Sequence, residues 1–113
     1  MTYTVTKTYT KQNDATFWPW EREGYAGGLD GLKSTGKLTS STSSEDGNTC
    51  IHTHKWASKS DWYESMNRSA SIHTSVSPMS NTYMSLNNIS CRIVEEDGTV
   101  FVFNSSTQAF EKE

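Results

Sequence analysis

The chain has 113 residues, a formal net charge of −3 at pH 7 and 33% hydrophobic residues, with four Trp, five Tyr and four Phe. This length predicts one domain with a single modest core, to which the aromatic residues contribute much of the apolar area. The ten Lys and Arg are scattered and match no nucleic-acid motif, and no apolar run approaches the ~18 residues of a membrane span. We therefore expect neither nucleic-acid binding nor membrane insertion.

The segment TYTVTKTYT, residues 2–10, alternates strictly and predicts a strand. Tyr3, Val5, Lys7 and Tyr9 share one face, and Thr residues fill the other. The polar alternation excludes a signal peptide, so we expect a cytoplasmic protein with reduced cysteines. The bias toward Ser, Thr and Asn is typical of viral or phage gene products, in which case the compartment is the host cytoplasm.

The next segment predicts a short helix near residues 15–24. An Asn-Asp pair stands before Ala15 as a potential cap, and Pro19 fits within the first helical turn. The Gly-rich composition of residues 24–36 then predicts a flexible loop.

Two alternating runs flank Asp46-Gly47 and predict a β-hairpin that begins near Lys37 and ends at Trp56. Ser58 is placed to cap the helix that follows, with Asp61 in the capping-box position. Apolar side chains at helical spacing continue this helix, namely Trp62, Tyr63 and Met66.

The remainder of the chain is less regular. Pro78 interrupts residues 71–88, in which Tyr83, Met84 and Leu86 are spaced for a short helical turn. A second hairpin is predicted around Asp97-Gly98. Residues 103–113 form a polar tail, which we expect to be loosely ordered except near Phe110.

The stretch CIHTHKW offers the main candidate for chemistry. On a strand, Cys50, His52, His54 and Trp56 point to one face. Two imidazoles at this spacing can bind one metal ion if a third ligand is near, and the candidates are His73, Cys91 and Glu95. Because the chain has no CxxC, HExxH or EF-hand pattern, we predict neither a metal nor a cofactor.

Two other interpretations of the stretch remain open. His52 and His54 can act as acid–base catalysts on a flat ligand that stacks on aromatic rings, and the FWPW stretch supplies Trp18 and Trp20 for such a wall. Otherwise the FWPW stretch is a core or interface anchor, and the histidines line a sheet face or a non-catalytic ligand pocket. The candidate ligand-binding residues are Trp18, Trp20, Cys50, His52, His54 and Trp56.

The predicted order of elements is strand, helix, hairpin, helix, strand, with one extra strand at the end. This order is the β-α-β-β-α-β pattern of the ferredoxin-like split βαβ fold, an α+β class with an antiparallel sheet. In detail, Trp56, Ser58, Asp61 and Trp62 resemble the hairpin end and S-x-x-D-W helix start of the dimeric α+β barrel superfamily, which includes antibiotic-biosynthesis monooxygenase-type domains.

The resemblance implies a homodimer whose sheets face each other. It also implies a choice among several activities, because that superfamily includes cofactor-free oxygenases, haem-degrading proteins and proteins without known activity. No haem-ligand motif of the family is found here. We expect a small-ligand-binding or accessory protein without catalysis. The alternatives are a cofactor-independent monooxygenase-like enzyme acting on an aromatic molecule, and a viral structural or host-interaction protein.

Overall fold

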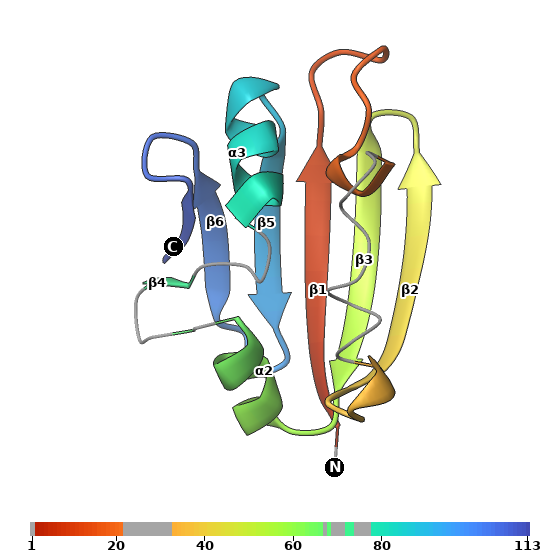
Figure 1. Cartoon of the computed structure of the whole chain (residues 1–113), viewed down its shortest axis with the longest axis vertical. Helices are drawn as coiled ribbons and strands as arrows, with labels where there is room; N and C mark the ends of the chain where they lie inside the picture. Colours follow the sequence, from red (N-terminus) through yellow and green to blue (C-terminus); the bar gives the residue numbers. More distant parts are fainter. Residues whose placement is uncertain (1, 22–32, 67, 69–71, 74–77) are drawn as a thin grey trace.

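A computed structural model describes residues 2–21, 33–66, 68, 72–73 and 78–113. They form one antiparallel sheet with strand order β2-β3-β1-β5-β6-β7-β4, and the α+β class is confirmed (Figure 1). The strands are β1 (Tyr3–Thr10), β2 (Leu38–Asp46), β3 (Thr49–Trp56), β4 (Ile72–His73), β5 (Ser90–Glu95), β6 (Val100–Asn104) and β7 (Ala109–Lys112). The helical elements are η1 (Pro19–Glu21), α2 (Lys59–Ser65) and α3 (Pro78–Leu86).

The core lies between one sheet face and the helical elements. Along β1 the buried and half-buried residues alternate, because successive side chains of a strand point to opposite faces. The buried apolar residues of β1 join the core with Trp18, with Trp62 from α2 and with Met84 from α3. Figure 1 shows α2 and α3 on the same side of the sheet. The opposite face carries the Thr residues of β1, together with Ile51 and Val102, which are exposed.

Both predicted hairpins are confirmed. Gly47 and Asn48 link β2 to β3, with Asp46 paired to Thr49 across the turn. Gly47 and Gly98 have φ values of 60° and 91°, a region that Gly occupies without the steric penalty that other residues incur there.

The helix that we predict after Trp56 is also confirmed. Ser58 accepts a hydrogen bond at 3.1 Å from the Asp61 backbone N–H, as the N-cap prediction requires. Trp62 and Met66 are buried, while Tyr63 packs at the edge of the core.

The predicted helix at residues 15–24 is wrong in its described part. The Asn13 side chain and carbonyl accept hydrogen bonds from Ala15 and Thr16, which closes a tight turn in place of a helix. The only helical element before residue 22 is the single turn η1, which Pro19 begins. Residues 22–24, and most of the predicted loop at 24–36, lie outside the described residues.

The C-terminal third contains more regular structure than its pattern predicts. α3 covers the short turn expected around Tyr83 and extends back to Pro78, which occupies its first position. Residues 103–113, expected as a loosely ordered tail, include β7, which pairs with β6 and buries Phe110. None of the described helices is long and apolar enough to cross a membrane.

A buried ion pair joins the C-terminal side of α2 to the sheet. The Arg68 guanidinium contacts the Glu95 carboxylate, which also accepts a 2.7 Å hydrogen bond from the Tyr3 hydroxyl. Arg68 lies between the rings of Tyr63 and Phe101, at 4.2 and 4.7 Å from their centroids. Burial, followed by the bond to Glu95, raises the pKa of Tyr3.

Candidate functional site

The register of β1 and β3 assembles the candidate site. Lys7 lies directly opposite His52, and the pairs on either side are Val5 with His54 and Tyr9 with Cys50. All these side chains lie on the sheet face that the helices cover. The prediction that the cysteine and the two histidines of the CIHTHKW stretch share one face is therefore confirmed. Ile51 and Lys55 are exposed on the opposite face.

Trp18, just before η1, and Trp20, within it, place two indole rings over this region. The end of η1 is fixed by Glu21, whose carboxylate accepts a 2.7 Å hydrogen bond from the Trp18 backbone N–H. The Lys11 ammonium lies 4.7 Å from the Trp18 ring centroid and donates a 2.7 Å hydrogen bond to the Thr16 carbonyl. Trp18 is fully buried, and Trp20 stacks on it with centroids 5.2 Å apart and planes 7° from parallel.

His52 meets the rings of Trp20 and Tyr9 at a tilt, with the ring planes 51° and 59° apart. His52 lies 4.3 Å from the Trp20 centroid and 5.2 Å from that of Tyr9. The His52 and His54 rings are 5.8 Å apart. His52 and Trp20 are half-buried and border the cluster on its accessible side, whereas His54 lies deeper and is only 2% exposed.

Both ring nitrogens of His54 are buried and have no hydrogen-bond partner among the described residues. An unsatisfied buried polar atom costs about 1–3 kcal/mol. Burial, followed by the neighbouring basic groups Lys7, His52 and Lys33, lowers the pKa of His54 to about 2. Burial and Lys7 lower the pKa of His52 to about 4. Both imidazoles are therefore neutral at pH 7 and surrounded by basic groups.

Lys7 is the third basic group, and it is only 7% exposed. Burial lowers its pKa. No carboxylate in the described part of the chain forms an ion pair with it. The Lys7 ammonium makes a cation–π contact with the Trp62 ring, at 5.5 Å from the ring centroid. A desolvated contact of this kind contributes about 2 kcal/mol, less than the several kcal/mol that it costs to remove a lysine charge from water. We refer to Lys7, His52 and His54 as the base cluster.

Within the described ranges, no three His, Cys, Asp or Glu side chains come together to hold a metal ion. Of the third ligands considered, Glu95 is engaged by Arg68 and Tyr3. The side chain of His73 is outside the described residues. Cys91 of β5 lies opposite Tyr9 of β1, and burial raises the pKa of its thiol to about 12.

The two cysteines flank one strand. Cys50 and Cys91 both pair with Tyr9, from β3 and from β5. Strands lie about 4.8 Å apart, so the two Cα atoms are about 10 Å apart, beyond the ~7 Å limit for a disulfide. Both are free thiols.

The remaining predicted ligand-binding residues divide into two groups. Trp18, Trp20, His52 and His54 are brought together. Trp56 is completely buried and packs on Trp62 at 5.5 Å, while Cys50 is buried beside Tyr9.

Lys7 was not among the predicted site residues. Its signal in the sequence was the alternation itself, which placed a lysine on the face of Tyr3, Val5 and Tyr9.

Chemically, the base cluster offers uncharged nitrogen acceptors and a lysine beside flat aromatic rings. No protein-family model, curated protein or solved structure matches the chain.

Proposed function

We propose that this protein binds a small, flat, anionic molecule, such as an aromatic carboxylate, at the base cluster. The observation that carries the proposal is the burial of both His54 ring nitrogens without a described hydrogen-bond partner, together with a buried Lys7 that forms no ion pair with a described carboxylate. Every charged neighbour that shifts the pKa of His54 is basic, so the local potential favours a negative charge. A bound carboxylate accepts hydrogen bonds from protonated nitrogens and offsets the burial cost of the cluster.

The aromatic part of the ligand is inferred from the rings around the cluster. Trp20 and Tyr9 lie 5.0 Å apart in an edge-to-face arrangement, and both contact the His52 ring. Tyr9 is buried and supports Trp20, and the half-buried Trp20 ring offers a planar ligand a contact surface with little loss of conformational entropy.

Isothermal titration calorimetry with 2-naphthoate and its uncharged analogue 2-naphthamide tests the proposal. The two probes share a shape and differ in charge. We expect 2-naphthoate to bind the wild-type protein at least tenfold more tightly, and Lys7→Met to remove this preference. The matched control Lys55→Met changes an exposed lysine on the opposite face and should retain it. Equal binding of the two probes, or a preference that survives Lys7→Met, would falsify the proposal.

A cofactor-independent, monooxygenase-like enzyme is the second candidate. It is favoured by His52, whose neutral, half-buried imidazole lies 4.3 Å from the Trp20 ring and is able to take a proton from a phenolic substrate. Binding is the better supported role, because a pKa of about 4 makes this imidazole a weak base at neutral pH. Dioxygen consumption with 1-naphthol that His52→Ala abolishes would favour the enzyme.

We also propose that the domain is a variant of the ferredoxin-like split βαβ fold. It forms a homodimer through its open face, which is the sheet face opposite the helices. The order β2-β3-β1-β5 supports this, because β1 lies between the second hairpin strand and the strand that follows the helices. The open face presents Ile51, which is 41% exposed, and Val102, which is 37% exposed.

Sedimentation equilibrium tests the dimer. We expect a dimer in the wild type and a monomer in Ile51→Lys, while Phe17→Lys, at an exposed residue before η1, should leave the dimer intact. A monomeric wild type, or an Ile51→Lys variant that remains dimeric, contradicts the proposed interface.

A further inference from the structure

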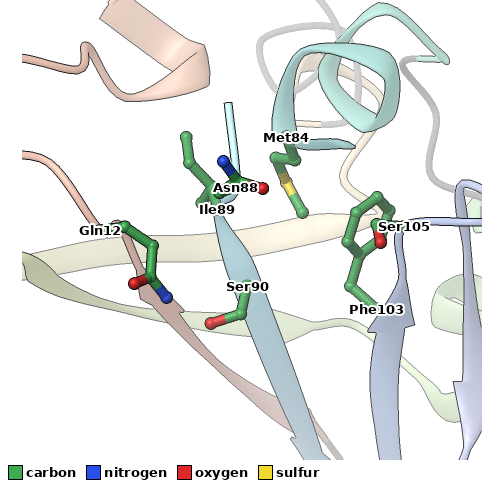
Figure 2. Close-up of a pocket in the computed structure, with 7 residues that line it drawn as sticks. All are labelled: Gln12, Met84, Asn88, Ile89, Ser90, Phe103 and Ser105. Atoms are coloured by element: carbon green, nitrogen blue, oxygen red, sulfur yellow. The ribbon is translucent and has the colours of Figure 1, made fainter. Parts of the chain in front are cut away.

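A pocket separate from the base cluster opens where α3 meets the sheet (Figure 2). Its volume is about 210 Å³, below the ~300–1,000 Å³ typical of sites for drug-sized ligands. Seven residues line it, and none belongs to the base cluster: Gln12, Met84, Asn88, Ile89, Ser90, Phe103 and Ser105.

The end of α3 shapes one side of the pocket. The Ile89 N–H donates a 3.0 Å hydrogen bond to the Met84 carbonyl, and Asn88 between them has a φ of 55°. This is the Schellman arrangement, with Asn88 in the left-handed conformation and an apolar pair on either side of it. The helix therefore ends with the Asn88 side chain exposed at the pocket and with Met84 and Ile89 buried.

The floor of the pocket is apolar and firmly packed. Met84 and Ile89 are nearly inaccessible, and Phe103 is 9% exposed. The Phe103 ring packs against Phe110 of β7 with centroids 5.3 Å apart, so its position does not depend on a ligand. Figure 2 shows Met84 and Phe103 next to each other on one side of the opening.

The rim is polar and carries no charge. It consists of the exposed side chains Gln12, Asn88, Ser90 and Ser105. Among the described residues the amides of Gln12 and Asn88 have no hydrogen-bond partner, whereas the Ser90 hydroxyl donates a long 3.4 Å bond to the Thr10 carbonyl. Each amide and hydroxyl can both donate and accept.

We propose that this pocket binds a neutral monosaccharide unit. A pyranose has hydroxyl groups around its perimeter that both donate and accept, as the groups of the rim do, and an apolar C–H face that can cover the accessible part of Phe103, which is 9% exposed. In Figure 2, Gln12 and Ser90 lie on one side of the opening, Asn88 on a second side and Ser105 on a third. Polar groups on several sides suit the hydroxyl groups around a sugar ring. The uncharged rim offers no compensation for a phosphate or a carboxylate, which distinguishes this pocket from the base cluster.

NMR titration tests this site. Methyl α-D-glucopyranoside, methyl β-D-galactopyranoside and N-acetyl-D-glucosamine are added separately to ¹⁵N-labelled protein, up to 100 mM. We expect at least one sugar to shift the side-chain amide signals of Gln12 and Asn88 and the backbone signals of Ser90 and Ser105. Gln12→Ala should weaken that sugar's binding by about tenfold or more.

Matched variants separate recognition from folding. Asn88→Gly removes the amide while keeping a residue that tolerates positive φ, so it should weaken binding and retain the fold. Ser105→Ala should weaken binding, whereas Ser106→Ala, at the exposed neighbour outside the pocket lining, should not. The assignment would be overturned if none of the three sugars caused shifts, or if the Gln12, Asn88 and Ser105 variants bound the sugar with unchanged affinity. It would also be overturned if adenosine, tested as a ligand that is not a simple sugar, bound more tightly than the sugars.

Discussion

Lys7 of β1 and His52 of β3 lie directly opposite each other on the buried face of the sheet. Burying two basic side chains next to each other is unfavourable to the folded state, because burial disfavours the charged form of both and the charge of Lys7 further disfavours the protonation of His52. Burial makes the dominant contribution to the lowered pKa of both groups. Such an arrangement persists at the expense of stability, as is common at functional sites.

Lys7→Met should therefore stabilise the protein. The substitution keeps an unbranched side chain of similar length and removes a buried charge that has no described acidic partner. We expect the free energy of unfolding, measured by urea denaturation, to rise by about 1–3 kcal/mol.

The control for this prediction is Lys55→Met. Lys55 is exposed on the opposite face, and its replacement should change the free energy of unfolding by less than about 0.5 kcal/mol. A Lys7→Met variant less stable than Lys55→Met would show that the Lys7 ammonium is held by a stabilising partner, and would remove the premise of the base cluster.

The buried imidazole of His54 predicts a loss of stability in mild acid. The unfolded side chain takes up a proton below its ordinary pKa of 6.5, whereas the folded one does so only near pH 2. Stability is therefore constant with respect to this group above pH 6.5, and it falls by about 1.4 kcal/mol per pH unit below that value. The predicted loss reaches about 2.7 kcal/mol at pH 4.5.

Urea denaturation of the wild type and of His54→Leu between pH 7 and 4.5 measures this effect. The variant should show a shallower decline. This window lies above the titration of Asp97, whose pKa is lowered to about 2 chiefly by hydrogen bonds from Thr99, so that carboxylate does not obscure the comparison. Parallel declines in the two proteins would mean that His54 is protonated in the folded state.

The Arg68–Glu95 pair should contribute strongly to stability. The exposed fractions of the two side chains are 6% and 0%, and Arg68→Met leaves a buried carboxylate without its cation. Breaking a buried pair from one side costs about 3–5 kcal/mol. We expect a loss of this size in thermal or urea unfolding.

Arg92→Met is the matched comparison. Arg92 pairs with Glu113 at 3.3 Å, but these side chains are 54% and 55% exposed. A surface pair contributes about 0–1 kcal/mol, so this variant should remain close to the wild type. Similar losses in the two variants would contradict the buried character of the Arg68–Glu95 pair.

The N-cap of α2 gives a local prediction. Ser58→Ala removes the acceptor for the Asp61 N–H and should lower the free energy of unfolding by about 1 kcal/mol. Ser60→Ala, at an exposed position within the same helix, serves as the control and should be neutral or slightly stabilising. Equal effects of the two substitutions would argue against the cap.

The parts of the fold that sequence predicts well are those governed by local rules. The Asp-Gly turns specify both hairpins, and Ser58 with Asp61 specifies the start of α2. The alternation of β3 correctly separates the face of His52 and His54 from that of Ile51 and Lys55.

The parts that sequence predicts poorly depend on distant contacts. Asn13 precedes a tight turn as readily as a helix, and the turn is held by Lys11, which also packs on Trp18. β7 is defined by its pairing with β6, which the polar composition of residues 103–113 does not reveal. The role of Lys7 depends on which strands flank β1, because only that pairing sets it opposite His52.

The most direct test of the base cluster is to measure the protonation of its histidines. We would monitor it by ¹⁵N NMR of the imidazoles, with and without saturating 2-naphthoate. In the free protein we predict that His52 and His54 stay neutral at pH 6, with His52 titrating near pH 4. Bound 2-naphthoate should raise the pKa of His52 by one unit or more. Ordinary titration near pH 6.5 in the free protein, or a His52 pKa that the ligand leaves unchanged, would contradict the proposed anion site.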